Sequence, residues 1–148
     1  MIIRELIDFT PESKGTNVAV ALRYFTGAIK KRSTAFIISD FISGPFDDQI
    51  KIANKKHDIV ALRLYDKHEE EFPNLGLIPV VDGETGEIEW VNTSSKEVRD
   101  TYKKAAAERN AQLKMTFSKS GVDFTSIGTH ESYVQPLMTL FKKRGSRR

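Results

Sequence analysis

The stretch TAFIIS at residues 34–39, followed by Asp40, decides the fold. Its apolar residues do not alternate with polar ones, which is typical of a strand covered on both faces in a parallel sheet. A second mostly apolar run, DIVALRLY at residues 58–65, follows a short helical segment at about 46–56. Strand, helix and strand joined by short links form a βαβ unit, so we expect an α/β fold.

The residues before this unit predict two helices. The first covers residues 2–9, and a loop at 10–15 separates it from a second helix that runs from Thr16 to about Lys31. In the second helix apolar residues recur at intervals of three and four, which gives one apolar stripe. Thr16 stands at its start, where a hydroxyl can accept hydrogen bonds from free backbone N–H groups, so we expect Thr16 to cap the helix.

Turn and capping signals organise the second half of the chain. Two short apolar runs flank DGETGE at residues 82–87, which is the pattern of a β-hairpin. Ser94 followed by Glu97 predicts a capping box at the start of a long helix, and Gly121 ends that helix. A short strand at 122–127 and a closing helix complete the expected order of elements.

Composition and charge exclude several classes of protein. The chain of 148 residues has a net charge of +3, but its last seven residues, KKRGSRR, carry five positive charges. We therefore interpret the basic character as a solvated tail and expect no nucleic-acid partner. The absence of cysteine excludes disulfides and thiolate metal sites. No apolar run approaches the ~20 residues of a membrane span, and no leader opens the chain, so we expect a cytoplasmic location.

Asp40 and Thr16 are the residues that suggest a functional site. Asp40 follows the strand at 34–39, and ligands of open α/β sheets bind at the carboxyl ends of the strands. Thr16 begins the helix just before that strand, so its hydroxyl should point to the same edge. A hydroxyl and a carboxylate are hard oxygen donors that suit Mg²⁺. Alternatively, Thr16 only caps its helix and Asp40 only caps the next turn.

Other polar and aromatic residues have structural interpretations beside functional ones. His57 and Asp58 precede the second strand, where they could form an acid/base pair or simply begin the strand. His68 lies among carboxylates in YDKHEEEFPNLG, but the spacing matches no zinc signature, and a solvated acidic turn is the better interpretation. Trp90 alternates with Ile88 in the hairpin, which favours a core position over a base-stacking one.

Four stretches together carry a family resemblance. They are GTNVAVALRYF, STAFIISDF, KKHDIVALRLYDKHEEEFPNLGLIPVVDGETGE and GVDFTSIGTHESYVQPLMTLFKKR, in this order along the chain. The set resembles the C-terminal half of the bacterial domain-of-unknown-function family 58, whose members are similar to von Willebrand factor type A domains. The resemblance covers essentially all 148 residues and implies a three-layer α/β/α Rossmann-like sandwich with a β-hairpin insertion.

The resemblance also implies a metal-ion-dependent adhesion site. In that site a DxSxS motif supplies three oxygens, and a threonine and an aspartate from two further loops complete it; Thr16 and Asp40 match these two positions. No DxSxS occurs in the chain. The resemblance therefore implies that residues 1–148 are the C-terminal part of a single domain whose N-terminal part is absent. The ion, Mg²⁺ or Mn²⁺, would bind the intact protein, because the site is incomplete here.

Two functions follow as hypotheses. The first is a non-catalytic module that binds an acidic residue of a protein partner through the metal, and the family context points to MoxR-type AAA+ ATPases in assembly or stress responses. The second is a Mg²⁺-dependent phosphoryl-transfer enzyme that uses Asp40. The absent first strand would also leave the apolar strand at 34–39 with an unpaired edge, so we expect self-association there.

Overall fold

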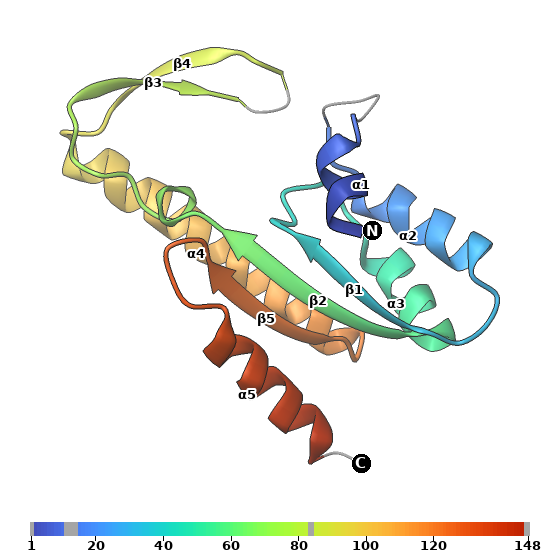
Figure 1. Cartoon of the computed structure of the whole chain (residues 1–148). Coiled ribbons are helices and arrows are strands. Elements are labelled where there is room, and N and C mark those ends of the chain that lie inside the picture. The colour runs from blue at the N-terminus through green and yellow to red at the C-terminus, as the bar shows by residue number, and fades with distance from the viewer. Residues whose placement is uncertain (1, 11–14, 83–84, 147–148) are drawn as a thin grey trace.

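The computed structural model describes residues 2–10, 15–82 and 85–146 (Figure 1). The helices are α1 (Ile2–Asp8), α2 (Val18–Ala28), α3 (Asp47–Lys56), α4 (Lys96–Lys119) and α5 (Val134–Gly145), with a short 3₁₀ helix η1 (Lys67–Glu69). The strands are β1 (Thr34–Ser39), β2 (Asp58–Tyr65), β3 (Leu77–Val81), β4 (Ile88–Asn92) and β5 (Asp123–Gly128). Residues 11–14 of the expected loop lie outside the described residues. No described helix combines the length and the apolar character that crossing a membrane requires.

The main sheet is parallel and has the strand order β1-β2-β5. Thr34 lies opposite Asp58, and Val60 lies opposite Asp123. The α/β fold and its βαβ unit, β1-α3-β2, are therefore confirmed, and both strands have the predicted bounds. β3 and β4 pair antiparallel in a separate two-stranded sheet, with Leu77 opposite Asn92, which confirms the predicted hairpin.

Helices cover both faces of the main sheet and make three layers. On one face Leu22 of α2, Ile50 of α3 and Phe117 of α4 share a core with Ile59 and Ala61 of β2. On the opposite face Leu137 and Leu140 of α5 pack against Val60 and Leu62 of β2. The alternation along β2 therefore divides its buried side chains between the two cores, as expected of a central strand.

β1 departs from the prediction that both of its faces are covered. Ala35 and Ile37 pack against the larger core, but Phe36 is 48% exposed and Ile38 is 61% exposed. The reason is the position of α5, which packs on β2; its Phe141 ring lies 6.2 Å from the Phe36 ring, measured between centroids. β1 thus has the composition of a central strand, but it lies at the edge of the sheet that the described residues form.

Two helix caps differ from the predicted ones by one residue. Asn17 rather than Thr16 caps α2, since its side-chain oxygen accepts from the Val20 N–H at 2.9 Å. Ser95 rather than Ser94 caps α4, accepting from the Val98 N–H at 3.4 Å. Each predicted cap has a neighbour of equal or better capping ability, and that neighbour caps the helix.

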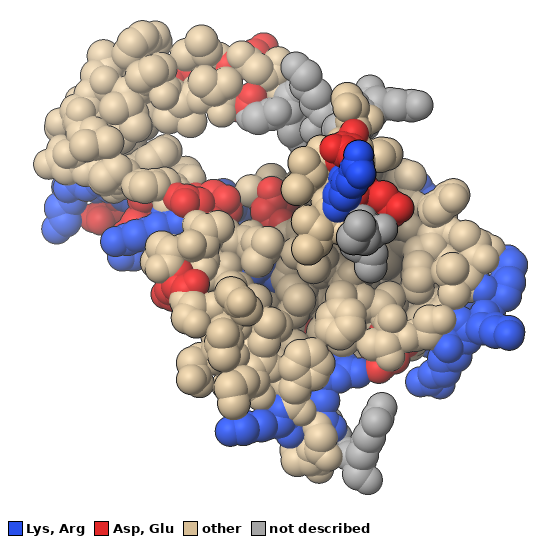
Figure 2. Space-filling model, in the orientation of Figure 1, with Lys and Arg blue, Asp and Glu red and all other residues tan. Residues whose placement is uncertain are grey.

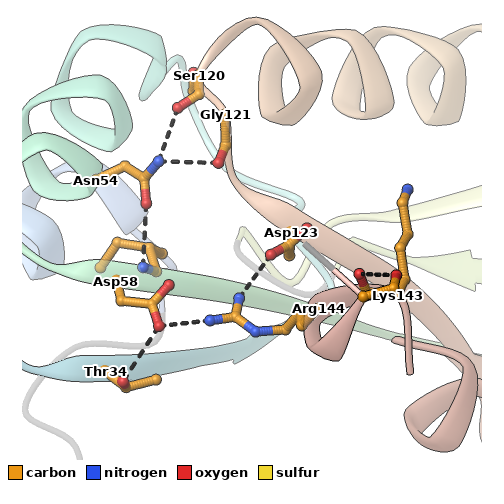
Figure 3. Close-up of polar contacts among 10 residues, drawn as sticks. Thr34, Asn54, Asp58, Ser120, Gly121, Asp123, Lys143 and Arg144 are labelled. Carbon is orange, nitrogen blue, oxygen red and sulfur yellow. Dashed lines mark hydrogen bonds and ion pairs between the residues drawn. The ribbon is translucent and has the colours of Figure 1, made fainter. Parts of the chain in front are cut away.

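Polar side chains fix the amino end of the main sheet (Figure 3). Arg144 of α5 donates to Asp58 of β2 at 2.5 Å and to Asp123 of β5 at 2.7 Å. Asn54 of α3 donates to the carbonyls of Ser120 and Gly121, each at 3.0 Å, and accepts from the Ile59 N–H at 3.1 Å. These bonds join α3, α5, β2 and the α4–β5 turn at one end of the sheet.

β3 and β4 form an arm that projects from the body of the molecule (Figures 1 and 2). Its base is anchored by the fully buried Thr93, whose hydroxyl donates to the Gly76 carbonyl at 2.8 Å and accepts from the Leu75 N–H at 3.0 Å. The arm itself is largely solvent-accessible. Trp90 is 63% exposed, so its predicted core position is wrong. Among the described residues the β3–β4 sheet has only two strands, and its side chains are mostly open to water.

Candidate functional site at the carboxyl edge of the sheet

Asp40 lies in the loop that leaves β1 at the carboxyl edge of the main sheet. It is half-buried, and its Oδ1 accepts hydrogen bonds from the Ile42 N–H at 3.0 Å and from the Ser39 hydroxyl at 3.3 Å. The first of these bonds forms an Asx-type turn, so Asp40 shapes the loop as well as facing solvent. In the described part of the chain both hydrogen bonds at Asp40 go to Oδ1, which leaves Oδ2 available to a ligand.

The residue after Asp40 holds a strained backbone conformation. Phe41 has a φ of 59°, a value that bulky side chains rarely adopt and that costs ~1–3 kcal/mol. Its ring is buried and lies 5.1 Å from the ring centroid of Phe117 and 5.9 Å from that of Phe46. The packing of this aromatic cluster compensates for the strain, and the resulting turn fixes the direction in which the Asp40 loop leaves the sheet.

Thr16 lies at the same end of β1 as Asp40, but the two residues line different cavities. Thr16 is exposed and lines a cavity of about 420 Å³ beside β1, together with Ser39. Asp40 lines a cavity of about 380 Å³ between its own loop and α4. The Val18 N–H donates to the Ser43 hydroxyl at 3.3 Å and ties the start of α2 to the Asp40 loop. The convergence of Thr16 and Asp40 on one ion stays a prediction.

The cavity beside Asp40 is bounded by a charged cluster around the buried Arg63. Arg63 of β2 is 7% exposed, and its Nη1 donates to Glu70 Oε1 at 3.0 Å. Asn110 of α4 donates to the same oxygen at 2.9 Å, and the Arg63 guanidinium lies 4.6 Å from the centroid of the Tyr65 ring. The sequence interpretation missed this cluster; its only signal was an arginine inside an otherwise apolar strand.

Beyond this cluster, hydrogen bonding and burial shift two pKa values at the end of β2. The backbone N–H of His68 and then its ring hold the pKa of Asp66 below its ordinary value, and the Thr129 hydroxyl adds to this effect. Burial, and then the negative charges of Glu131 and Glu70, raise the pKa of Tyr65. His68 therefore orders an exposed turn, in agreement with its interpretation as part of a solvated acidic segment.

His57 has a structural place. It is 1% exposed, its ring centroid lies 4.6 Å from that of Phe25, and neither ring nitrogen has a hydrogen-bond partner among the described residues. A hydrogen-bonded His57–Asp58 acid/base pair is therefore excluded, and the interpretation of His57 as the entry to β2 holds. Glu69 Oε2, at the border of the Asp40 cavity, is also buried without a hydrogen-bond partner in the described part of the chain.

The chain has relatives of similar sequence in mycobacteria. An uncharacterized protein of Mycobacterium avium is 27% identical over 130 residues, which make up 86% of this chain and 76% of that protein. Uncharacterized proteins of Mycobacterium bovis and Mycobacterium tuberculosis are each 25% identical over 130 residues. Those residues are 86% of this chain but 40% of each relative, so the chain spans less than half of their length.

No solved structure matches the chain. The model of a protein family does match it, over residues 1–112, and that family is described as a protein of unknown function, DUF58. The match includes α1 to α3, the Asp40 loop, the hairpin arm and most of α4, and it agrees with the resemblance to domain-of-unknown-function family 58. The likeness to von Willebrand factor type A domains stays a prediction. Since it covers well over half of the residues, the chain belongs to the DUF58 family of proteins of unknown function.

Proposed function

We propose that the protein is a non-catalytic protein-binding module whose recognition surface is the carboxyl edge of the main sheet around Asp40. The observation that carries the proposal is the Asp40 loop itself. One oxygen of Asp40 holds the turn while the other is left available, and the strained Phe41 fixes the loop beside a cavity. Backbone strain of this kind gathers at ligand-binding positions, where it keeps a loop in one geometry.

A divalent ion fits the donor chemistry of this edge. The Asp40 carboxylate and the hydroxyls of Thr16, Ser39 and Ser43 are hard oxygen donors of the kind that Mg²⁺ and Mn²⁺ prefer. The number of ligands is lower than a complete site requires, because no group of three or more His, Asp or Glu that could hold a metal occurs among the described residues. The proposal therefore takes Asp40 and Thr16 as part of a site completed by water and by ligands outside this chain.

The ion would supply an electrostatic link to a carboxylate of the partner. MoxR-type AAA+ ATPases are the partner class that we propose, on the basis of the family resemblance. The non-catalytic part of the proposal is supported by two polar side chains that line the cavity beside Asp40 and are already hydrogen-bonded. Arg63 pairs with Glu70, and Thr116 donates to Asp47 at 2.7 Å. A guanidinium–carboxylate pair such as Arg63–Glu70 supplies no nucleophile.

Mn²⁺ titration followed by NMR tests the metal assignment. Asp40→Asn removes the charge and keeps an oxygen that can accept from the Ile42 N–H, so the loop should persist. We expect Mn²⁺ to broaden the amide signals of Phe41 and Ile42 first in the original chain, and Asp40→Asn to weaken this effect by about tenfold. Asp48→Asn is the matched control, because that carboxylate is 85% exposed on α3. The titration is made on the full-length protein, because the site is incomplete in this chain, and broadening that is equal in Asp40→Asn and in Asp48→Asn would refute metal binding at Asp40.

Pull-down of a MoxR-type ATPase with and without EDTA tests the partner separately. Binding should require the divalent ion and should be lost in Asp40→Asn. If binding persists in EDTA, the ATPase is a partner but the divalent ion does not link the two proteins. A phosphatase assay of the original chain and of Asp40→Asn addresses the enzymatic alternative, since Asp40-dependent turnover with Mg²⁺ would overturn the non-catalytic assignment.

A further inference from the structure

The β3–β4 arm holds an apolar surface out in solvent. Pro79 lies opposite Trp90 and Val81 lies opposite Ile88, so these side chains share one face of the arm with Leu77. On that face Leu77, Val81, Ile88 and Trp90 are each between 59% and 63% exposed. Contiguous exposed apolar side chains of this kind mark interaction surfaces.

Contacts at the base of the arm fix it to α4. The Phe72 ring, which precedes β3, stacks on the Tyr102 ring of α4 with the centroids 3.9 Å apart. After β4, Arg99 Nη1 donates to the carbonyls of Thr93 and Ser94 at 2.6 and 3.0 Å. Both ends of the arm are therefore held, and a preorganised surface loses little conformational freedom when it binds.

The two outer edges of the arm differ. Among the described residues β3 and β4 pair only with each other, so each strand has an outer edge. β3 contains Pro79, which has no backbone N–H and weakens any hydrogen-bond ladder on that edge. β4, with the sequence IEWVN, has no proline and no bulge in its pairing with β3. The outer edge of β4 is therefore the one suited to a further strand.

The side chains along β4 have a distinct alternation. Ile88 and Trp90 lie on the apolar face, and the exposed Glu87 and Glu89 alternate with them and point to the other face. Residues 72–95 contain four acidic side chains and no Lys or Arg, so the rest of the chain has a net charge of +7 although the whole has +3. Figure 2 shows acidic and no basic side chains on the projecting part of the arm, in the face in view.

We propose that the outer edge of β4 binds an extended segment of a partner protein in which apolar and basic residues alternate. In an added strand, the apolar side chains would lie beside Ile88 and Trp90, and the basic ones beside Glu87 and Glu89. Neighbouring side chains on one face of a sheet are ~5 Å apart, close enough for ion pairs. The main chain gives affinity and the alternation gives specificity. This surface lies outside the Asp40 site and needs no metal, so it goes beyond the function proposed above.

The same glutamates disfavour a second copy of the chain as the occupant. Two β4 strands side by side would place Glu87 and Glu89 of one copy beside those of the other, and like charges in neighbouring strands are destabilising. Charges on edge strands commonly prevent self-pairing in this way. A basic partner turns this repulsion into attraction, so one feature both rejects the wrong strand and selects the right one.

The fluorescence of Trp90 tests the proposal, because it is the only tryptophan in the chain. The probes are two ten-residue peptides, one alternating isoleucine with lysine and the other alternating isoleucine with glutamate. We expect the lysine peptide to shift the emission to shorter wavelengths and to bind at least about tenfold more tightly than the glutamate peptide. This preference should decrease as salt is added. Equal binding of the two peptides, or no shift with either, would overturn the proposal.

Charge reversal tests the assigned residues. The double variant Glu87→Lys, Glu89→Lys should prefer the glutamate peptide. Asp100→Lys with Glu108→Lys is the matched control, because both residues are exposed on α4 and the net charge changes by the same amount. The control should still prefer the lysine peptide. If the two double variants have the same preference, overall charge and not the β4 edge determines binding, and the proposal fails.

Hydrogen exchange followed by NMR tests the backbone part of the proposal. The lysine peptide should slow exchange at alternate amides of β4 that exchange rapidly without it, and should add no such protection to the rapidly exchanging amides of β3. Protection confined to β3 would overturn the assigned edge. Protection of these β4 amides without peptide would also overturn the proposal: in the full-length protein it would mean that the protein's own residues cover the edge, and at high concentration of the chain it would mean that a second copy does.

Discussion

Arg144 fixes the last helix to the amino end of the sheet, and its removal should destabilise the protein measurably. Its guanidinium bonds to carboxylates on two different strands, Asp58 on β2 and Asp123 on β5. The side chains of Arg144 and Asp123 are 18% and 17% exposed, and that of Asp58 is 33% exposed. Arg144→Met keeps most of the apolar stem and leaves the two carboxylates without this cation.

The expected loss in the free energy of unfolding is larger than that for an exposed ion pair and smaller than that for a fully buried one. Exposed pairs contribute ~0–1 kcal/mol, whereas breaking a fully buried pair costs ~3–5 kcal/mol because a charge is left without its partner. Arg144 makes two charge-assisted bonds, and all three side chains retain some contact with water. We expect Arg144→Met to lower the free energy of unfolding by about 2–3 kcal/mol at neutral pH.

Urea unfolding followed by circular dichroism measures this loss. Lys143→Met is the matched control, because Lys143 occupies the same turn of α5 and is exposed; its effect should stay within ~0.5 kcal/mol. In an Asp123→Asn background the cost of Arg144→Met should fall by about 1 kcal/mol, since the two residues are coupled. If Arg144→Met and Lys143→Met have the same small effect, the bonds of Arg144 to Asp58 and Asp123 contribute no more to stability than an exposed ion pair does. That result would contradict the expected loss.

Three further predictions concern a cap, a strained residue and a shifted pKa. Asn17→Ala should lower the free energy of unfolding by about 1 kcal/mol, while Thr16→Ala should barely change it; equal losses in urea would contradict the assigned cap. Phe41→Gly should cost about 1 kcal/mol less than Phe41→Ala in calorimetry, because glycine adopts a positive φ without strain; a larger loss for glycine would argue against strain. Bonds from His68 lower the pKa of Asp66 from 3.8, so this group stabilises the fold above that pH and the stabilisation is lost as pH falls through the folded-state pKa. Asp66→Asn should therefore flatten the decline of stability below about pH 4, and identical acid profiles would exclude the effect.

The strands could be predicted from the sequence because their apolar runs are bounded by polar residues. TAFIIS and DIVALRLY correspond to β1 and β2 with no shift in either bound. Helix ends were less certain, since Thr16 and Asn17 are both good caps and only the backbone conformation chooses between them. The exposure of Phe36 and Ile38 could not be predicted at all, because it depends on where α5 packs, about one hundred residues away in the chain.

The candidate site was predictable in part for the same reason. Asp40 follows an apolar run, so its place at a strand end can be read directly from the sequence. The cluster of Arg63, Glu70 and Asn110 joins a strand, a turn and a helix, and no short motif links residues that are 40 positions apart. The positive φ of Phe41 was equally hidden, because nothing in SDF marks a bulky residue for that conformation.

The two ends of the main sheet differ in a way that bears on function. At the amino end Arg144 and Asn54 tie together α3, α5, β2 and β5 with bonds of 2.5 to 3.1 Å. The carboxyl end also has hydrogen bonds, from Arg63 and Asn110 to Glu70, but there the chain in addition holds a strained turn at Phe41 and an available oxygen on Asp40 beside a cavity. A rigid amino end can hold the strands in register while the loops at the other end meet a ligand, which is the division expected of a parallel sheet. Substitutions at Arg144 should therefore act on stability, and those at Asp40 on binding.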